Sequence, residues 1–77
     1  MDKKELIGFL EINEPVFIYN NKEFGICNMG DFIIAGNHED PATEQKYNTV
    51  EELLDDWIVE GVKFSDIANK VLTEYFN

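Results

Sequence analysis

Apolar residues near the N-terminus recur with the period of an amphipathic helix. Asp2 is followed at capping-box spacing by Glu5, which predicts a helix that begins after Asp2. The apolar stripe of this helix consists of Leu6, Ile7, Phe9 and Leu10. Because Pro15 disfavours helical geometry at the residue before it, we expect the helix to end near Ile12.

From residue 16 to residue 35 the pattern changes to short runs of β-branched and aromatic residues. The runs are 16–19, 23–27 and 32–35. Such runs are typical of strands. Asn20 and Asn21 tolerate the positive φ values of a two-residue turn, and Gly30 suits a second turn. The pattern therefore predicts a three-stranded antiparallel β-meander.

The first turn also fixes the register of the first two strands. Tyr19 should lie opposite Lys22, which places Phe17 opposite Phe24. One face then collects Phe17, Tyr19, Phe24, Ile26, Ile33 and Ala35, and the other collects Val16, Ile18, Cys27, Phe32 and Ile34. Because both faces are apolar, we expect each to be covered, either by helices or by a second subunit. A homodimer is therefore one candidate assembly.

Two helices are predicted in the C-terminal half, after a long polar loop at residues 36–48 that lacks periodicity. Thr49 and Glu52 have capping-box spacing at the start of the first of these helices. Its apolar stripe consists of Val50, Leu53, Leu54, Trp57 and Ile58. Gly61 suits the left-handed stop of this helix. The last helix then runs to the end of the chain with the stripe Phe64, Ile67, Ala68, Val71, Leu72, Tyr75 and Phe76.

Taken together, residues 1–77 are predicted to form a single α+β domain with an N-terminal helix, a three-stranded antiparallel β-meander and two C-terminal helices. The hydrophobic fraction is 44%, of which aromatic residues make a large part, so the chain is too apolar to remain disordered. A domain of this size often needs additional support, and the single residue Cys27 cannot form an internal disulfide. This is a second reason to consider a homodimer.

The charge of the chain excludes several classes of partner. Sixteen Asp and Glu residues face six Lys, with no Arg, which gives a net charge of −10. Nucleic acids and anionic membranes bind clustered Lys and Arg, so we expect direct binding to neither. The lone cysteine fits a reducing compartment, and no signal peptide or apolar run long enough to span a membrane is apparent. We therefore expect a cytoplasmic location.

The acidic residues are concentrated between residues 39 and 60, where eight carboxylates accompany only Lys46. Five of them fall on the polar side of the helix predicted after Thr49: Glu51, Glu52, Asp55, Asp56 and Glu60. One interpretation is a solvated helix face. The other is a docking surface for a basic protein, in which case these five are the candidate partner-binding residues. Mimicry of DNA phosphates by carboxylates is a specific version of the second interpretation.

No catalytic, metal or cofactor site is predicted. The only histidine, His38, lies in the polar loop without a candidate nucleophile, which favours an exposed loop residue. The alternative is a weak cation site formed by Asp31, His38, Glu39 and Asp40, but the ligand spacing of a calcium-binding loop is missing. Cys27 stands in an apolar strand, so we expect a buried and inert thiol.

Two short motifs carry a resemblance to a known group of proteins. They are Phe-x-Tyr-Asn-x-Lys at residues 17–22 and Tyr-x-Thr-x-Glu-Glu-Leu-Leu at residues 47–54, followed by the Gly61 break. With these, the chain resembles small uncharacterised proteins of low-GC Gram-positive bacteria and their phages, although Asn21 stands where that group often has glycine. The resemblance implies the same order of elements and assigns no activity to any residue.

The leading prediction is a small acidic protein-interaction module without enzymatic activity, acting through protein contacts and as a homodimer. The alternative is an acidic inhibitor or nucleic-acid mimic that binds a basic partner protein. The first depends on the two apolar sheet faces, and the second depends on the acidic stretch.

Overall fold

The computed structural model describes residues 1–76, beginning with a helix that is capped as its sequence predicts. Helix α1 spans Lys3–Ile12. The side chain of Asp2 accepts a hydrogen bond from the backbone N–H of Glu5, and the Glu5 side chain accepts one from the N–H of Asp2. This complete capping box satisfies two backbone donors at the helix start. The buried side chains of α1 are Leu6 and Leu10.

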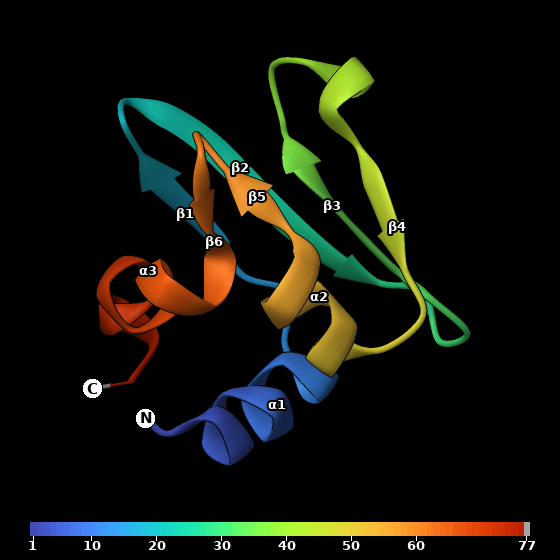
Figure 1. Cartoon of the computed structure of the whole chain (residues 1–77), viewed down its shortest axis with the longest axis vertical. Helices are drawn as coiled ribbons and strands as arrows, with labels where there is room; N and C mark the ends of the chain where they lie inside the picture. The colour runs from blue at the N-terminus through green and yellow to red at the C-terminus, as the bar shows by residue number, and fades with distance from the viewer. Residues whose placement is uncertain (77) are drawn as a thin grey trace.

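An antiparallel sheet follows, in the strand order β1-β2-β3-β4 (Figure 1). The strands are β1 (Val16–Tyr19), β2 (Lys22–Asn28), β3 (Ile33–Asn37) and β4 (Gln45–Tyr47). Tyr19 lies opposite Lys22 and Phe17 opposite Phe24, so the predicted register is confirmed. The turn between β1 and β2 has the positive φ values of 51° and 63° that its two asparagines tolerate.

The prediction of three strands and a long loop at residues 36–48 was wrong in detail. Strand β3 continues to Asn37, the 3-10 helix η1 occupies Pro41–Thr43, and β4 pairs with β3 to add a fourth strand. The Thr43 hydroxyl accepts a hydrogen bond from the N–H of Asn37, which closes the connection. Strand β4 has only three residues, too few to show alternation, and it is held by its pairing with β3 rather than by local propensity.

Helix α2 begins after Thr49 as predicted and ends earlier than predicted, spanning Val50–Asp56. The next residues form a two-stranded hairpin of β5 (Ile58–Val59) and β6 (Val62–Lys63). Glu60 and Gly61 take positive φ values of 50° and 83° in its turn, so Gly61 ends no helix here. The predicted apolar stripe of this helix includes Ile58, but that side chain is 55% exposed and lies outside the core.

The last helix, α3, spans Phe64–Val71 and is followed by the 3-10 helix η2 at Thr73–Tyr75. Phe64, Ile67, Ala68 and Leu72 are buried, as their spacing predicts. Tyr75 is 41% exposed and is not a core residue. The predicted continuation of the helix to the end of the chain is therefore wrong for the residues up to 76, and Asn77 lies outside the described residues.

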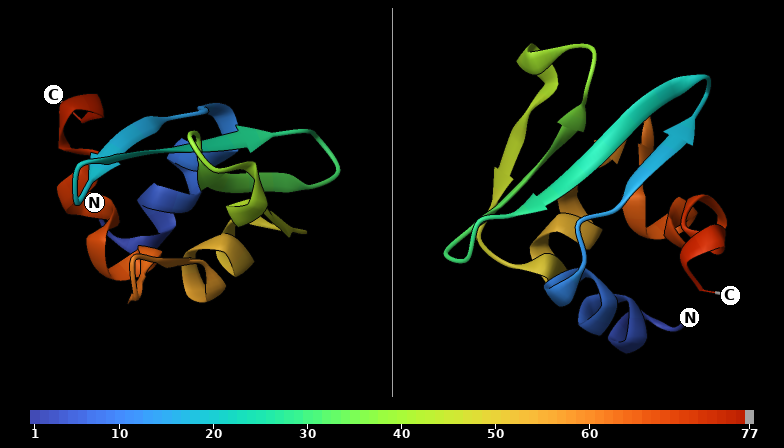
Figure 2. Two further views of the ribbon diagram at one scale, coloured as in Figure 1. Left: turned by 90° about the horizontal axis from the view of Figure 1, so that it is seen from above. Right: turned by 180° about the vertical axis from the view of Figure 1, so that it is seen from behind.

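All three α-helices and the β5–β6 hairpin lie on one side of the sheet (Figure 2). The core between these layers is centred on four aromatic side chains, Phe17, Phe24, Trp57 and Phe64. The ring of Phe17 stacks on the rings of Phe24 and Phe64 with centroid distances of 5.5 Å in both cases. Trp57 packs against Phe64 at 5.0 Å. Packing of this kind ties the hairpin and α3 to the sheet.

Candidate protein-binding surfaces

The five predicted partner-binding residues do not all lie on one helix. Glu51, Glu52, Asp55 and Asp56 are on helix α2, whereas Glu60 is in the turn of the β5–β6 hairpin. The expectation of a single acidic helix face is therefore wrong, because α2 ends four residues before Glu60. Two of the five carboxylates also form ion pairs within the chain, Asp55 with Lys3 and Glu60 with Lys22.

The Lys3 ammonium group lies 3.0 Å from a carboxylate oxygen of Asp55. The hydrogen bond that Lys3 donates to this carboxylate is the main cause that raises the pKa of Lys3, and charge interactions with Asp55 and Glu51 add to it. The side of α2 that carries Asp55 thus faces α1. Both partners are exposed, so the pair contributes little to stability.

The other two acidic residues of α2 face strand β4. Burial is the main cause that raises the pKa of Tyr47, followed by the charges of Asp56 and Glu52. The Tyr47 hydroxyl accordingly stays neutral at physiological pH and is available as a hydrogen-bond donor or acceptor. In the hairpin turn, Glu60 accepts a hydrogen bond from Lys22 at 2.9 Å.

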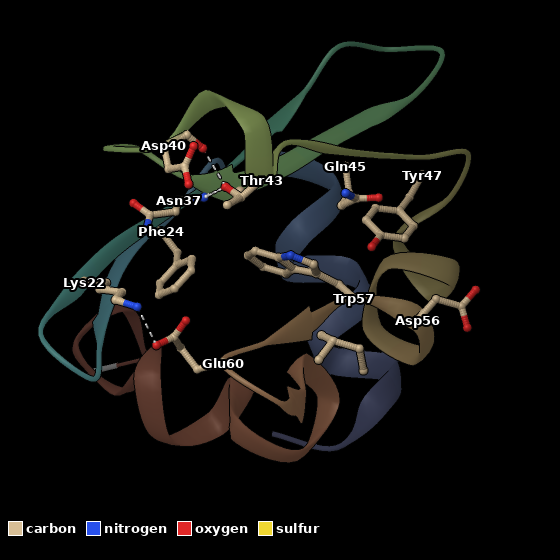
Figure 3. Close-up of a pocket in the computed structure, with 12 residues that line it drawn as sticks. Lys22, Phe24, Asn37, Asp40, Thr43, Gln45, Tyr47, Asp56, Trp57 and Glu60 are labelled. Atoms are coloured by element: carbon tan, nitrogen blue, oxygen red, sulfur yellow. Dashed lines mark hydrogen bonds and ion pairs between the residues drawn. The ribbon is translucent and has the colours of Figure 1, made fainter.

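A cavity of about 430 Å³ opens between the sheet and the β5–β6 hairpin (Figure 3). Its apolar wall includes Phe24 and Trp57, with Tyr47 at one side. Its carboxylates are Asp40, Asp56 and Glu60. These three come from the segment before η1, the end of α2 and the hairpin turn, so chain folding brings together acidic groups that are up to twenty residues apart. We call this feature the acidic cavity.

Trp57 is buried except for 3% of its surface, and its ring lines the acidic cavity. Within residues 1–76 no buried side-chain nitrogen or oxygen atom lacks a hydrogen-bond partner. Figure 3 shows the ring between Phe24 and Tyr47, with its nitrogen-bearing edge toward Thr43 and Gln45. The prediction that Trp57 belongs to the apolar core is confirmed.

The opposite side of the sheet presents what we call the open face. Its apolar side chains are Val16, Ile18, Cys27, Phe32 and Ile34, the same set that strand alternation predicts. The helices leave this face open to view in the right panel of Figure 2. Ile18 is 63% exposed. Of the two covers predicted for each face, helices or a second subunit, the helices described here cover only the other face.

Cys27 is exposed on the open face, so the prediction of a buried structural cysteine is wrong. Its strand is apolar as expected, but no helical layer buries this side of the strand among residues 1–76.

His38 is exposed as predicted, and its ring lies over Gly25. A β-carbon at Gly25 would come 2.0 Å from Nε2 of His38, so only glycine fits under the ring in this position.

The open face has few charged residues: Glu23 and Lys46 on its strands, and Glu44 beside its depression. Glu23 stands opposite Ile18, and Lys46 stands opposite Ile34, so both point to this side. The Lys46 ammonium lies 4.2 Å from the centre of the Phe32 ring, a cation–π distance. Nδ1 of His38 is 3.7 Å from the Glu23 carboxylate. In a chain of net charge −10, the strand residues of this face therefore carry one negative and one positive group.

The structure brings no metal-ligand set together within residues 1–76. Asp31, His38, Glu39 and Asp40, the residues of the alternative cation site, form no group of three ligating side chains there. His38 and Cys27 line a small depression of about 150 Å³ on the open face, with no hydrogen bond between them. Among the helices described, none has the length and apolar character needed to cross a membrane.

Comparison with known proteins adds no relative. No family model matches the chain, and neither a curated protein nor a solved structure does. Two features of the structure are therefore the candidates for function: the open face and the acidic cavity.

Proposed function

We propose that this chain is a small protein-interaction module without enzymatic activity, and that the open face of its sheet binds a second copy of the chain. The observation that supports this most is the uncovered apolar face itself, with Ile18 63% exposed at one edge and Phe32 under Lys46 at the other. Large uncovered apolar patches mark interaction sites in soluble proteins.

The charge distribution favours a second copy as the occupant. Two chains of net charge −10 repel one another, so they can associate only where the local charge is low. The open face meets this condition, because its strand residues have one carboxylate, that of Glu23, and one ammonium group, that of Lys46. A homodimer related by a two-fold axis would place equal apolar patches against each other.

Sedimentation over a range of protein concentrations tests this proposal. We expect a monomer–dimer equilibrium that Ile18→Lys shifts toward the monomer, since a lysine would introduce a charge on the interface. Ile58→Lys is the matched control, because Ile58 is similarly exposed, at 55%, and lies on the hairpin on the other side of the sheet. A wild-type chain that stays monomeric at high concentration, or equal effects of the two substitutions, would overturn the dimer.

The salt dependence provides a second readout of the same experiment. Added salt screens the repulsion between two acidic chains, so we expect dimerisation to strengthen as the ionic strength rises. An interface held by ion pairs would weaken instead. A dimer that dissociates in salt would therefore contradict the open face as its interface.

The alternative function, an acidic inhibitor or nucleic-acid mimic that binds a basic protein, receives support from the exposure of Glu51, Asp55 and Asp56 on α2. The pairing of Asp55 with Lys3 and of Glu60 with Lys22 weakens it, since a phosphate mimic needs free carboxylates. Replacing Glu51, Glu52, Asp55 and Asp56 by amides would test it. Binding of a basic partner that survives this replacement would exclude the mimic.

A further inference from the structure

We infer that the small depression on the open face is the docking site for the Ile18 side chain of a second copy of the chain, and that the two copies exchange this contact. The inference rests on the proposed homodimer, in which the contact would fix how the two sheets are placed. Three features of the open face carry it: the glycine floor of the depression, the exposure of Ile18, and the distance that separates the two within one chain.

Two glycines form the floor of the depression. Gly25 of β2 stands directly opposite Gly36 of β3, so both strands lack a β-carbon at the same height of the sheet. The lining is mainly apolar, and the residues around the glycines are Cys27, Ile34, Asn37, His38, Pro41 and Glu44. The volume of about 150 Å³ is close to that of an apolar cavity that accepts a benzene ring. A single aliphatic side chain therefore fits into it.

Ile18 is the most exposed large apolar side chain of the four-stranded sheet. It is 63% exposed, and it is the only strand residue of this sheet among the large hydrophobic side chains that are exposed within residues 1–76. An aliphatic side chain gains free energy when it leaves water. Because isoleucine is β-branched, its χ1 angle is already restricted, and little side-chain entropy is lost when it docks. Ile18 is therefore suited to enter a depression on another molecule.

Ile18 does not reach the depression of its own chain. It lies on β1 opposite Glu23, whereas Gly36 lies on β3, and β2 runs between these strands. Neighbouring strands are about 4.8 Å apart, so the two positions are separated by about 10 Å across the sheet. A side chain of four carbon atoms is too short for this distance. Only another molecule can therefore place an Ile18 side chain in the depression.

Two-fold symmetry makes a second copy the occupant. Each copy has both parts of the contact, so an axis that runs between the two facing sheets, midway between Ile18 and the depression, forms both contacts at once. Facing sheets pack about 10 Å apart, with side chains that interdigitate. Neither Ile18 nor the glycine floor is charged, which suits two chains that each have a net charge of −10.

The substitution Ile18→Cys tests the contact by position. Cys27 is the only cysteine of the chain and lines the depression, so oxidised glutathione should link position 18 of one copy to Cys27 of the other. Within one chain this link cannot form, because Cys27 lies about 13 Å along the strand from Glu23, the partner of Ile18, and a disulfide needs Cα atoms within about 7 Å. The control is Ile58→Cys, on the other side of the sheet, which should link to Cys27 at least about tenfold more slowly.

A mixture of two variants tests the exchange of the contact. Ile18→Ala removes the inserted side chain and Cys27→Phe fills the depression, so each variant alone should dimerise about tenfold more weakly than the wild-type chain. The mixed dimer keeps one intact contact, in which Ile18 of the Cys27→Phe chain enters the open depression of the Ile18→Ala chain. We therefore expect the mixture to associate more tightly than either variant by itself, as measured by sedimentation of one fluorescently labelled variant with the other in excess. Cys27→Leu repeats the test with a smaller replacement.

Three results would overturn this contact and leave the homodimer in place. They are equal rates of linkage to Cys27 in Ile18→Cys and Ile58→Cys, disulfides that join only like positions of two copies, and a mixture that associates no more tightly than its components. Mass spectrometry identifies the linked positions, since trypsin cleaves after Lys22 and separates residues 18 and 27. A wild-type chain that stays monomeric would overturn the proposed homodimer itself, and the contact with it.

Discussion

The hydroxyl group of Tyr75 makes two hydrogen bonds to the backbone of Val16. It accepts one from the Val16 N–H at 3.1 Å and donates one to the Val16 carbonyl oxygen at 2.9 Å. Val16 starts the edge strand β1, so a side chain from the C-terminal segment takes the place of a neighbouring strand there. Covered edges of this kind prevent pairing with other chains.

Removing this hydroxyl should therefore destabilise the fold. We expect Tyr75→Phe to lower the free energy of unfolding by about 1 to 2 kcal/mol, because two hydrogen bonds are lost. The packing of the ring on Phe9, with a centroid distance of 5.9 Å, should remain. Denaturant unfolding measures the change. The control is Tyr19→Phe, whose hydroxyl makes no hydrogen bond within residues 1–76, and a loss as large in the control would contradict the assignment.

Two glycines in the sheet should respond differently to a methyl group. At Gly36 a β-carbon would lie 3.0 Å from the backbone of Glu44, so the segment that leads into β4 would have to shift. At Gly25 the obstacle is the His38 ring, whose side chain is 46% exposed and can turn away. We expect Gly36→Ala to cost about 1 to 3 kcal/mol and Gly25→Ala less. Equal unfolding free energies for the two variants would refute this difference.

Alanine substitutions at Gly61, in the β5–β6 turn, and at Gly8, in helix α1, should change the stability of the chain in opposite directions. Gly61 has a φ of 83°, and an alanine there should destabilise the chain by about 1 kcal/mol. Gly8 lies inside helix α1 with open space around its α-carbon, so Gly8→Ala should stabilise the chain by about 0.5 to 1 kcal/mol. Thermal unfolding of both variants checks the signs. Stabilisation by Gly61→Ala would show that the turn has been assigned wrongly.

The raised pKa of Tyr47 predicts a loss of stability in alkaline solution. The folded state favours the neutral phenol, so its contribution is present below the ordinary tyrosine pKa of about 10 and is lost as the pH rises through the folded value. Asp56→Asn should lower the pKa of Tyr47 only in part, because burial is the larger cause. NMR titration of the Tyr47 ring measures this change. Asp66→Asn is the control, and an unchanged pKa in Asp56→Asn would contradict the proximity of the two side chains.

Local signals in the sequence were sufficient for the N-terminal half of the fold. The capping residues Asp2 and Glu5 and the twin asparagines of the first turn act between neighbours, so the α1 start and the β1–β2 register were predicted correctly. The start of α2 at Thr49 is a signal of the same kind, with the hydroxyl accepting from the N–H of Glu52.

The remaining features depend on contacts between distant segments. Strand β4 is defined by its pairing with β3. Ile58 has the spacing of the helical stripe, but it lies in strand β5 and pairs with β6. Gly61 was interpreted as a helix stop, whereas it belongs to the turn between the β-branched residues Ile58 and Val59 on one side and Val62 on the other. The acidic cavity could not be predicted, because Asp40, Asp56 and Trp57 meet only after β4 and the hairpin are in place.

Isotope-filtered NMR on a mixture of labelled and unlabelled chains tests whether the open face binds a second copy of the chain. We expect contacts between chains that involve the methyl groups of Ile18 and Ile34, and that disappear in Ile18→Lys. Contacts between chains confined to Ile58 or to the helices, or none at concentrations where sedimentation detects a dimer, would contradict it.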